Sequence, residues 1–86
     1  MERLIYMMAD KAELRVCKVI LMLSAEYGNV VPFTHQDIGD MAGVSRETTS
    51  RTIVHLQSAG LITPYRGSIT ILNLKKMASL FDDVDA

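Results

Sequence analysis

The sequence predicts a mainly α-helical domain with a small antiparallel β wing, the winged helix-turn-helix architecture of a three-helix core and a hairpin. Apolar residues recur at helical spacing before residue 28, two capped helical segments are separated by residues 43–45, and β-branched runs follow at 61–63 and 68–72. With 86 residues, 49% of them hydrophobic and 22% charged, the chain has the composition of one folded globular domain.

A first amphipathic helix is expected from Asp10 to about Tyr27, where Gly28 and Asn29 end it. Its apolar stripe consists of Val16, Val19, Ile20 and Leu23, widened by Leu14, Cys17 and Leu21. Charged residues alternate with this stripe, namely Lys11, Glu13, Arg15 and Lys18. Residues 1–8 are also compatible with a helix, but their apolar side chains have no obvious partner in so short a chain.

Two further helices have clear start signals. After a short extended segment at 30–33, Thr34 is expected to cap a helix over 35–42, with Asp37 completing a capping box. The buried face of this helix is expected to comprise Ile38, Met41 and Ala42. Gly43 permits a tight turn, and Ser45 can cap a helix over 46–59.

A hairpin and a last helix complete the expected domain, which spans residues 10–81. Strands at 61–63 and 68–72 are joined by a turn at 64–67, after Gly60 ends the third helix. Asn73 can cap a short helix that packs through Leu74, Met77 and Leu80. Residues 82–86, with three aspartates, are expected to form a disordered acidic tail.

Charge and residue types narrow the function. The net charge is −1, but residues 44–81 hold five basic side chains against one acidic one, an asymmetry typical of a nucleic-acid-binding face. The lone Cys17 excludes an intramolecular disulfide and indicates a reducing, cytoplasmic setting. His35 and His55 lack partners at metal-ligand spacing, and no nucleophile–base pair or membrane-length apolar run is present. We therefore expect no metal, no cofactor in this domain, no membrane contact and no enzymatic activity.

The third helix separates into two faces when successive residues are placed about 100° apart. One face carries Thr49, Thr52, Ile53, Leu56 and Ala59 and is expected to pack. The other carries the candidate base-contacting residues Arg46, Glu47, Ser50 and Arg51. Arginine can donate two hydrogen bonds to guanine, and glutamate can accept one from cytosine. The alternative is a solvated face with a Glu47–Arg51 pair; Val54 lies on the polar side without a clear role.

Around this helix, a second group of residues is suited to contact the DNA backbone. These are Thr34, His35, Gln36, Ser45, Thr48, His55, Arg66 and Ser68, with Tyr65 of the wing beside them. Contacts to phosphates position a protein on DNA without reading its sequence. Ordinary capping or turn formation is the alternative role for each of them.

Several stretches together resemble one family. They are Thr-His-Gln-Asp-Ile-Gly at 34–39, Gly-Val-Ser-Arg-Glu-Thr at 43–48, Ser-Arg at 50–51, Gly-Leu-Ile at 60–62 and Arg-Gly-Ser-Ile at 66–69. This pattern closely resembles the C-terminal winged helix-turn-helix DNA-binding domain of the Crp/Fnr family of bacterial transcription regulators, over about residues 10–80.

The resemblance implies a sequence-specific double-stranded-DNA-binding output domain, with helix 46–59 in the major groove. It also implies a homodimeric full-length protein, residues 1–9 as the end of a dimerisation or linker helix, and a palindromic site with TGA-containing half-sites. RNA polymerase is a further partner of some members, but the connection at 27–33 is shorter than the activating loop of the best-known one. His35 stands where many relatives have arginine. The effector of a missing N-terminal domain is not specified.

Two other functions remain open from the sequence. A winged helix can serve as a protein–protein interaction module, because fold does not fix function. The chain could also be a stand-alone small DNA-binding regulator that dimerises through its N-terminal residues.

Overall fold

The computed structural model describes residues 11–85, with residues 81–85 given by their backbone alone. Its elements are helix α2 (Lys11–Tyr27), strand β1 (Val30–Val31), helix α3 (His35–Ala42), helix α4 (Arg46–Ser58), strand β2 (Ile62–Tyr65), strand β3 (Ser68–Ile71) and helix α5 (Leu74–Asp85). The predicted mainly α class with a β wing is confirmed. The expected dimerisation-helix end at 1–9 and Ala86 lie outside the described residues.

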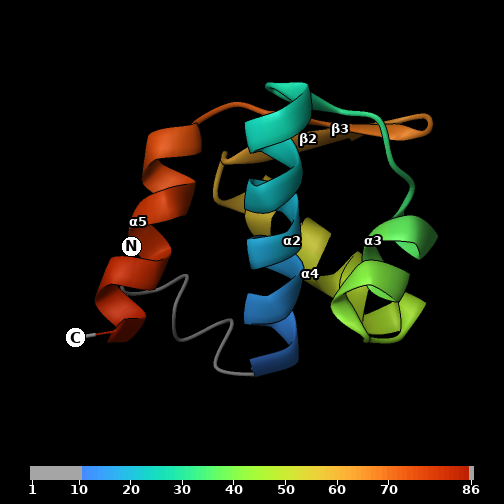
Figure 1. Cartoon of the computed structure of the whole chain (residues 1–86), viewed down its shortest axis with the longest axis horizontal. Helices are drawn as coiled ribbons and strands as arrows, with labels where there is room; N and C mark the ends of the chain where they lie inside the picture. Colours follow the sequence, from blue (N-terminus) through green and yellow to red (C-terminus); the bar gives the residue numbers. More distant parts are fainter. Residues whose placement is uncertain (1–10, 86) are drawn as a thin grey trace.

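Helix α2 stands at the centre of the view, with α5 on one side, α3 on the other, α4 crossing behind it and the sheet across one end (Figure 1). Its predicted stripe is buried at Val16, Cys17, Val19 and Ile20. These side chains join one apolar core with Ile38 of α3, Ile53 and Leu56 of α4, and Met77 and Leu80 of α5, together with apolar residues of the sheet. The core therefore fixes α3, α4 and the sheet to a common support.

The sheet contains one strand more than the expected hairpin. Its order is β1-β3-β2, all antiparallel, because the extended segment at 30–31 pairs with Thr70 and Ile69 of β3. The turn at 64–67 was predicted too long: Pro64 and Tyr65 belong to β2, so Arg66 and Gly67 alone make the turn. Proline is tolerated there because β2 is an edge strand, where one row of N–H groups needs no partner.

Most helix boundaries agree with the prediction, and four details differ. Helix α4 ends at Ser58, with Ala59 as an exposed C-cap residue. Met41 and Leu74, predicted to be buried, are 47% and 42% exposed. Around the axis of α3, Met41 and the buried Gly39 lie on opposite sides of Ile38, so Met41 turns away from the buried face. Around the axis of α5, Leu74 is displaced by about a quarter turn from the buried Met77 and Leu80.

The fourth difference concerns the acidic tail. Helix α5 continues to Asp85, beyond the expected end of the domain at residue 81, and the disordered acidic tail stays a prediction. No glycine or proline follows Asn73 to end the helix, and residues 74–85 are otherwise compatible with it. Asn73 does cap this helix as predicted, since its side-chain oxygen accepts from the Lys76 backbone at 3.0 Å.

Candidate nucleic-acid interface

Capping contacts build the α3–turn–α4 unit from local sequence. The Thr34 hydroxyl accepts from the Asp37 N–H at 3.1 Å, and the Asp37 carboxylate accepts from the Thr34 N–H at 3.0 Å. The predicted capping box is therefore confirmed. Gly43 ends α3 with φ of 70°, in the left-handed region that favours glycine. Ser45 then accepts from the Thr48 N–H at 3.1 Å and starts α4 as predicted.

Gly39 sets how closely α3 approaches α4. A Cβ atom at this position would lie 2.7 Å from Thr49 Oγ1 and 3.1 Å from the Val44 carbonyl oxygen. Both distances are too short for an unstrained contact, so a side chain cannot be accommodated without a shift of the two helices. The family motif includes this glycine, but its packing role emerges only from the fold.

Helix α4 presents the two faces that the sequence predicts. Thr49, Thr52, Ile53 and Leu56 are buried, with the two threonine hydroxyls bonded to backbone oxygens one turn earlier. The opposite face carries the exposed Arg46, Glu47 and Arg51 and the half-buried Ser50. Val54 also lies in the open, 56% exposed. The polar face of α4 is thus accessible along its first two turns.

A cleft of about 430 Å³ brings three distant segments of the chain together beside this face. It lies between the start of α3, the start of α4 and the tip of the wing. Its lining comprises Phe33, Thr34, His35, Gln36, Arg46, Tyr65, Gly67 and Ser68. Five residues that sequence analysis assigned separately to DNA contact therefore share one concave surface. Tyr65, at 77% exposed, extends from the same edge.

His35 occupies the wall of this cleft. Its Nδ1 lies 3.2 Å from the Ser50 hydroxyl of α4, so a predicted backbone-contacting residue and a predicted base-contacting residue meet. Burial and, secondarily, the nearby Arg46 guanidinium lower the pKa of His35 from its ordinary value of 6.5. Both effects favour the neutral ring over its protonated form.

The remaining predicted contact residues have local partners. Gln36 donates to the Asp40 carboxylate at 2.9 Å, and the Ser45 hydroxyl donates to Thr48 Oγ1 at 3.0 Å. Arg66 is exposed in the wing turn. Thr34 and Ser45 thus perform the capping that was the alternative role for them, and they do so at the edge of the candidate surface.

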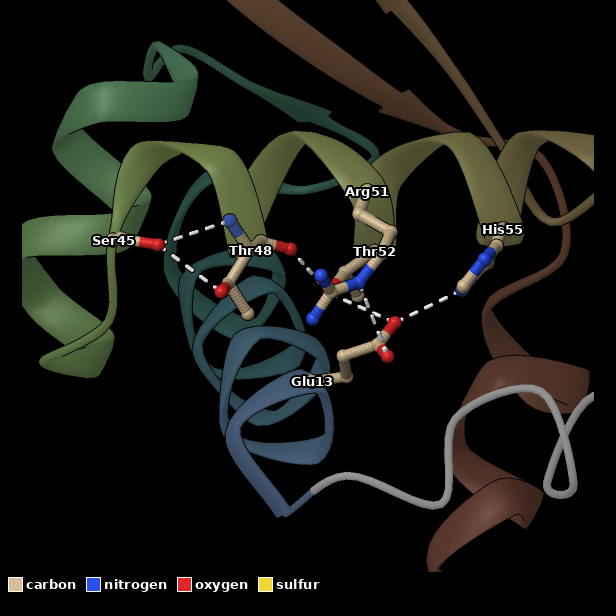
Figure 2. Close-up of polar contacts among 6 residues, drawn as sticks. All are labelled: Glu13, Ser45, Thr48, Arg51, Thr52 and His55. Carbon is tan, nitrogen blue, oxygen red and sulfur yellow. Dashed lines mark hydrogen bonds and ion pairs between the residues drawn. The ribbon is translucent and has the colours of Figure 1, made fainter.

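Arg51 and His55 meet Glu13 of α2 (Figure 2). The sequence predicts Glu13 among the charged residues that alternate with the apolar stripe, and the structure corrects this, because Glu13 is buried. Glu13 of α2 is only 3% exposed, and its carboxylate contacts α4. Arg51 Nε lies 3.6 Å from Glu13 Oε1, whereas His55 Nδ1 lies 2.9 Å and Thr52 Oγ1 3.3 Å from Oε2. The periodicity of α2 held a signal: Glu13 precedes Val16 and Cys17 by three and four residues and so lies on the buried stripe.

Other classes of site find no support in the part of the chain that the structure describes. Among residues 11–80, whose side chains the structure describes, no group of three or more histidine, cysteine, aspartate or glutamate side chains could hold a metal ion. Within the same residues, every helix is too short or too polar to cross a lipid bilayer. Burial, and next the charge of Glu13, raise the pKa of the Cys17 thiol to about 12, as for a cysteine of the core.

A helix-turn-helix on a three-helix core, with a β hairpin beside its second helix, defines a winged helix-turn-helix domain. The chain belongs to the family of Crp-like helix-turn-helix domains, whose family model matches residues 14–80. Such domains serve DNA-binding transcription regulators and are generally non-enzymatic.

Two solved structures are similar to the chain. The Thermus thermophilus catabolite activator protein is 24% identical, with a TM-score of 0.77 over 85% of this chain and 35% of that one, a likeness of fold. A transcriptional regulator of the Crp/Fnr family from Eubacterium rectale is 28% identical, with a TM-score of 0.70 over 92% of this chain and 36% of that one. The chain thus spans about a third of the length of these proteins. The search of curated protein sequences found no match.

Proposed function

We propose that this domain binds double-stranded DNA in a sequence-specific manner, as the output domain of a Crp/Fnr-type transcription regulator. The observation that carries the proposal is the convergence of the α3 start, the exposed face of α4 and the wing tip on one cleft. A recognition helix that enters the major groove places its flanking elements against the phosphate backbone. The arrangement of the cleft beside the polar face matches that requirement.

In this proposal, Arg46, Glu47, Ser50 and Arg51 contact base edges. Arg46 and Arg51 are exposed and carry the planar donor pair that guanine O6 and N7 accept. Glu47 supplies an acceptor suited to cytosine N4. Ser50, half-buried against His35, is short enough to allow the helix to approach the groove closely.

The cleft and the wing contact the DNA backbone. Thr34, His35, Gln36 and Ser68 line the cleft with Arg46, and Arg66 adds a cation at the wing tip. The helix starts at Thr34 and Ser45 bring backbone N–H groups and the positive end of each helix dipole to the same side. Thr48 and His55 are the remaining proposed backbone contacts, and His55 would reach a phosphate through Nε2 while its Nδ1 stays against Glu13.

The proposed setting is a cytoplasmic, homodimeric parent protein that binds a palindromic site with TGA-containing half-sites. Two recognition helices related by a two-fold axis read two half-sites about one helical turn apart, so one domain alone is expected to bind weakly. RNA polymerase is an additional proposed partner of the parent. The effector that such a parent senses is not specified by this domain.

The proposal is tested by selection from a randomised duplex pool at two salt concentrations, with sequencing of the retained DNA. The expected result is enrichment of a TGA-containing half-site and an affinity that falls steeply as salt rises, because phosphate contacts release counterions. An affinity insensitive to salt would instead favour a protein–protein interaction module. An absence of enrichment at low salt would mean either that a dimer is required to hold the site or that the polar face of α4 meets a protein.

A further inference from the structure

A buried carboxylate is costly unless charged or hydrogen-bonding partners compensate for its lost hydration. Glu13 is the buried acidic residue of the described chain, and its three partners all come from one turn of α4. Two of them are basic side chains, namely Arg51 and His55. The first helix of the domain therefore holds the middle of α4 through one charged group.

The geometry at Arg51 is specific. Glu13 Oε1 faces the Nε atom at 3.6 Å, close to the side-chain stem, whereas 51% of the arginine side chain stays exposed. The Nη1 and Nη2 atoms form a separate donor edge at the tip of the planar guanidinium group. This edge is the one that guanine O6 and N7 would accept. The ion pair with Glu13 therefore uses a different atom of the guanidinium group from those that a base would contact.

We propose that Glu13 is a positioning residue for DNA recognition: by holding Arg51 from α2, it determines how sharply the domain discriminates one base pair of its half-site. This inference rests on the function proposed above. An unrestrained arginine loses much rotamer entropy when it binds, and a pre-oriented one loses less. This saving in entropy helps binding only to a base whose acceptors lie where Glu13 directs the guanidinium group. It therefore increases the discrimination between bases more than the overall affinity for DNA.

The remaining partners of Glu13 keep the carboxylate in place for this role. His55 Nδ1 lies 2.9 Å from Oε2, and Oε1 is left to face Arg51. The Thr52 hydroxyl shares its one proton between the Thr48 carbonyl at 2.8 Å and Oε2 at 3.3 Å, so its contact with Oε2 is the weaker of the two. Figure 2 shows the three α4 side chains converging on the carboxylate from one side of the helix. The residues that support the carboxylate contact Oε2, whereas Arg51 faces Oε1. A substitution at a supporting residue can therefore serve as a control for one that removes the ion pair with Arg51.

The test compares the 86-residue chain with its Glu13→Gln and Thr52→Val variants, using the duplex that the wild-type chain selects and its single-base variants. The Glu13→Gln change keeps the size and a hydrogen-bond acceptor but removes the charge that holds Arg51. We expect discrimination at one base pair to fall about five- to tenfold in this variant, with nonspecific binding at low salt unchanged. Thr52→Val removes one bond to Oε2 without touching the Arg51 pair, and we expect it to retain the base preference.

A double-variant cycle shows whether the effect passes through Arg51. In an Arg51→Ala background, Glu13→Gln is expected to cause no further loss at that base pair. A loss of discrimination that persists in this background, or an equal loss in Thr52→Val, would assign Glu13 a purely structural role. Equal or higher discrimination in Glu13→Gln would also overturn the inference while leaving the proposed function intact. A wild-type chain that selects no sequence would contradict the proposed function itself.

A measurement on the wild-type chain keeps the inference testable if Glu13→Gln does not fold. In NMR spectra, nuclear Overhauser contacts between the side chains of Arg51 and Glu13 are expected to persist when the selected duplex is added. Loss of these contacts on binding would mean that the ion pair breaks to allow recognition, and would overturn the inference.

Discussion

Helix α4 carries two arginines in different surroundings. Arg46, at the start of the helix, lines an open cleft with His35 and the wing tip. Arg51, little more than one turn later, lies against the buried Glu13 of α2. The first belongs to a surface assembled from three segments, and the second to a network within the core. The candidate contact surface therefore combines Arg46, which lines an open cleft, with Arg51, which lies against a buried carboxylate.

A substitution of Gly39 is expected to have the largest effect, because Gly39 sets the distance between α3 and α4, the two helices that line the cleft. We expect Gly39→Ala to destabilise the domain by about 1–3 kcal/mol, since the new methyl would overlap Thr49 Oγ1 and approach the Val44 carbonyl. Urea unfolding followed by circular dichroism measures the effect.

The matched control is the Gly39→Ala, Thr49→Ala double variant, which removes the nearest atom. We expect it to be less destabilised than the sum of the two single changes. Strict additivity would show that the close approach at Gly39 is not what limits the packing of α3 on α4.

The two arginines themselves sharpen the comparison. We expect Arg51→Ala to lower discrimination at one base pair by about ten- to a hundredfold, equivalent to about 1–3 kcal/mol. Arg46→Ala is expected to weaken binding to all duplexes as well, because this side chain lies in the cleft beside the backbone-contacting group. Binding isotherms on the selected duplex and its single-base variants measure both. Identical profiles for the two variants would contradict the distinction.

The parts of this molecule that follow from the sequence are those whose physical cause is local. The caps at Thr34 and Ser45 and the apolar stripe of α2 depend on neighbours within a turn or two, and each appears as predicted. Glu13 is different because its environment comes from residues 38–42 positions away. Strand β1 likewise forms only because Val30 and Val31 pair with Thr70 and Ile69 of β3, which are distant in the sequence. Local sequence patterns do not predict this pairing.

The pH dependence of DNA binding tests the cleft wall. His35 has a lowered pKa in the free domain, because of burial and the nearby Arg46, whereas a phosphate would favour the charged ring. Binding then takes up a proton, so DNA affinity should rise as pH falls below about 6.5, by at most about tenfold per pH unit. Folding stability should change in the opposite direction, because a lowered pKa in the fold means that acidification favours the unfolded chain.

Two variants isolate the contribution of His35 to this pH dependence. His35→Arg keeps a cation at every pH and His35→Gln is never charged, so both are expected to lose part of the slope of affinity against pH. Affinity measured by fluorescence anisotropy between about pH 5.5 and 8 tests the expectation. A slope unchanged in both variants would remove His35 from the contact surface.

The smallest expected effect concerns Cys17, one turn along α2 from Glu13. Burial and the charge of Glu13 raise the pKa of this thiol to about 12, so the thiolate is scarce near neutral pH. We expect no modification by a thiol reagent at about pH 8 on the timescale of minutes, and rapid modification in concentrated urea. Rapid reaction in the folded chain would show that the α2 core next to Glu13 opens.

The proposed DNA-binding surface is tested most directly by mapping the backbone amide signals of the labelled chain in NMR spectra as the selected duplex is added. The account predicts that the largest shifts fall at the start of α3, in the first two turns of α4 and at residues 65–68 of the wing. Shifts centred instead on α5 or on the exposed surface of α2 around Met22, with the cleft unaffected, would contradict it.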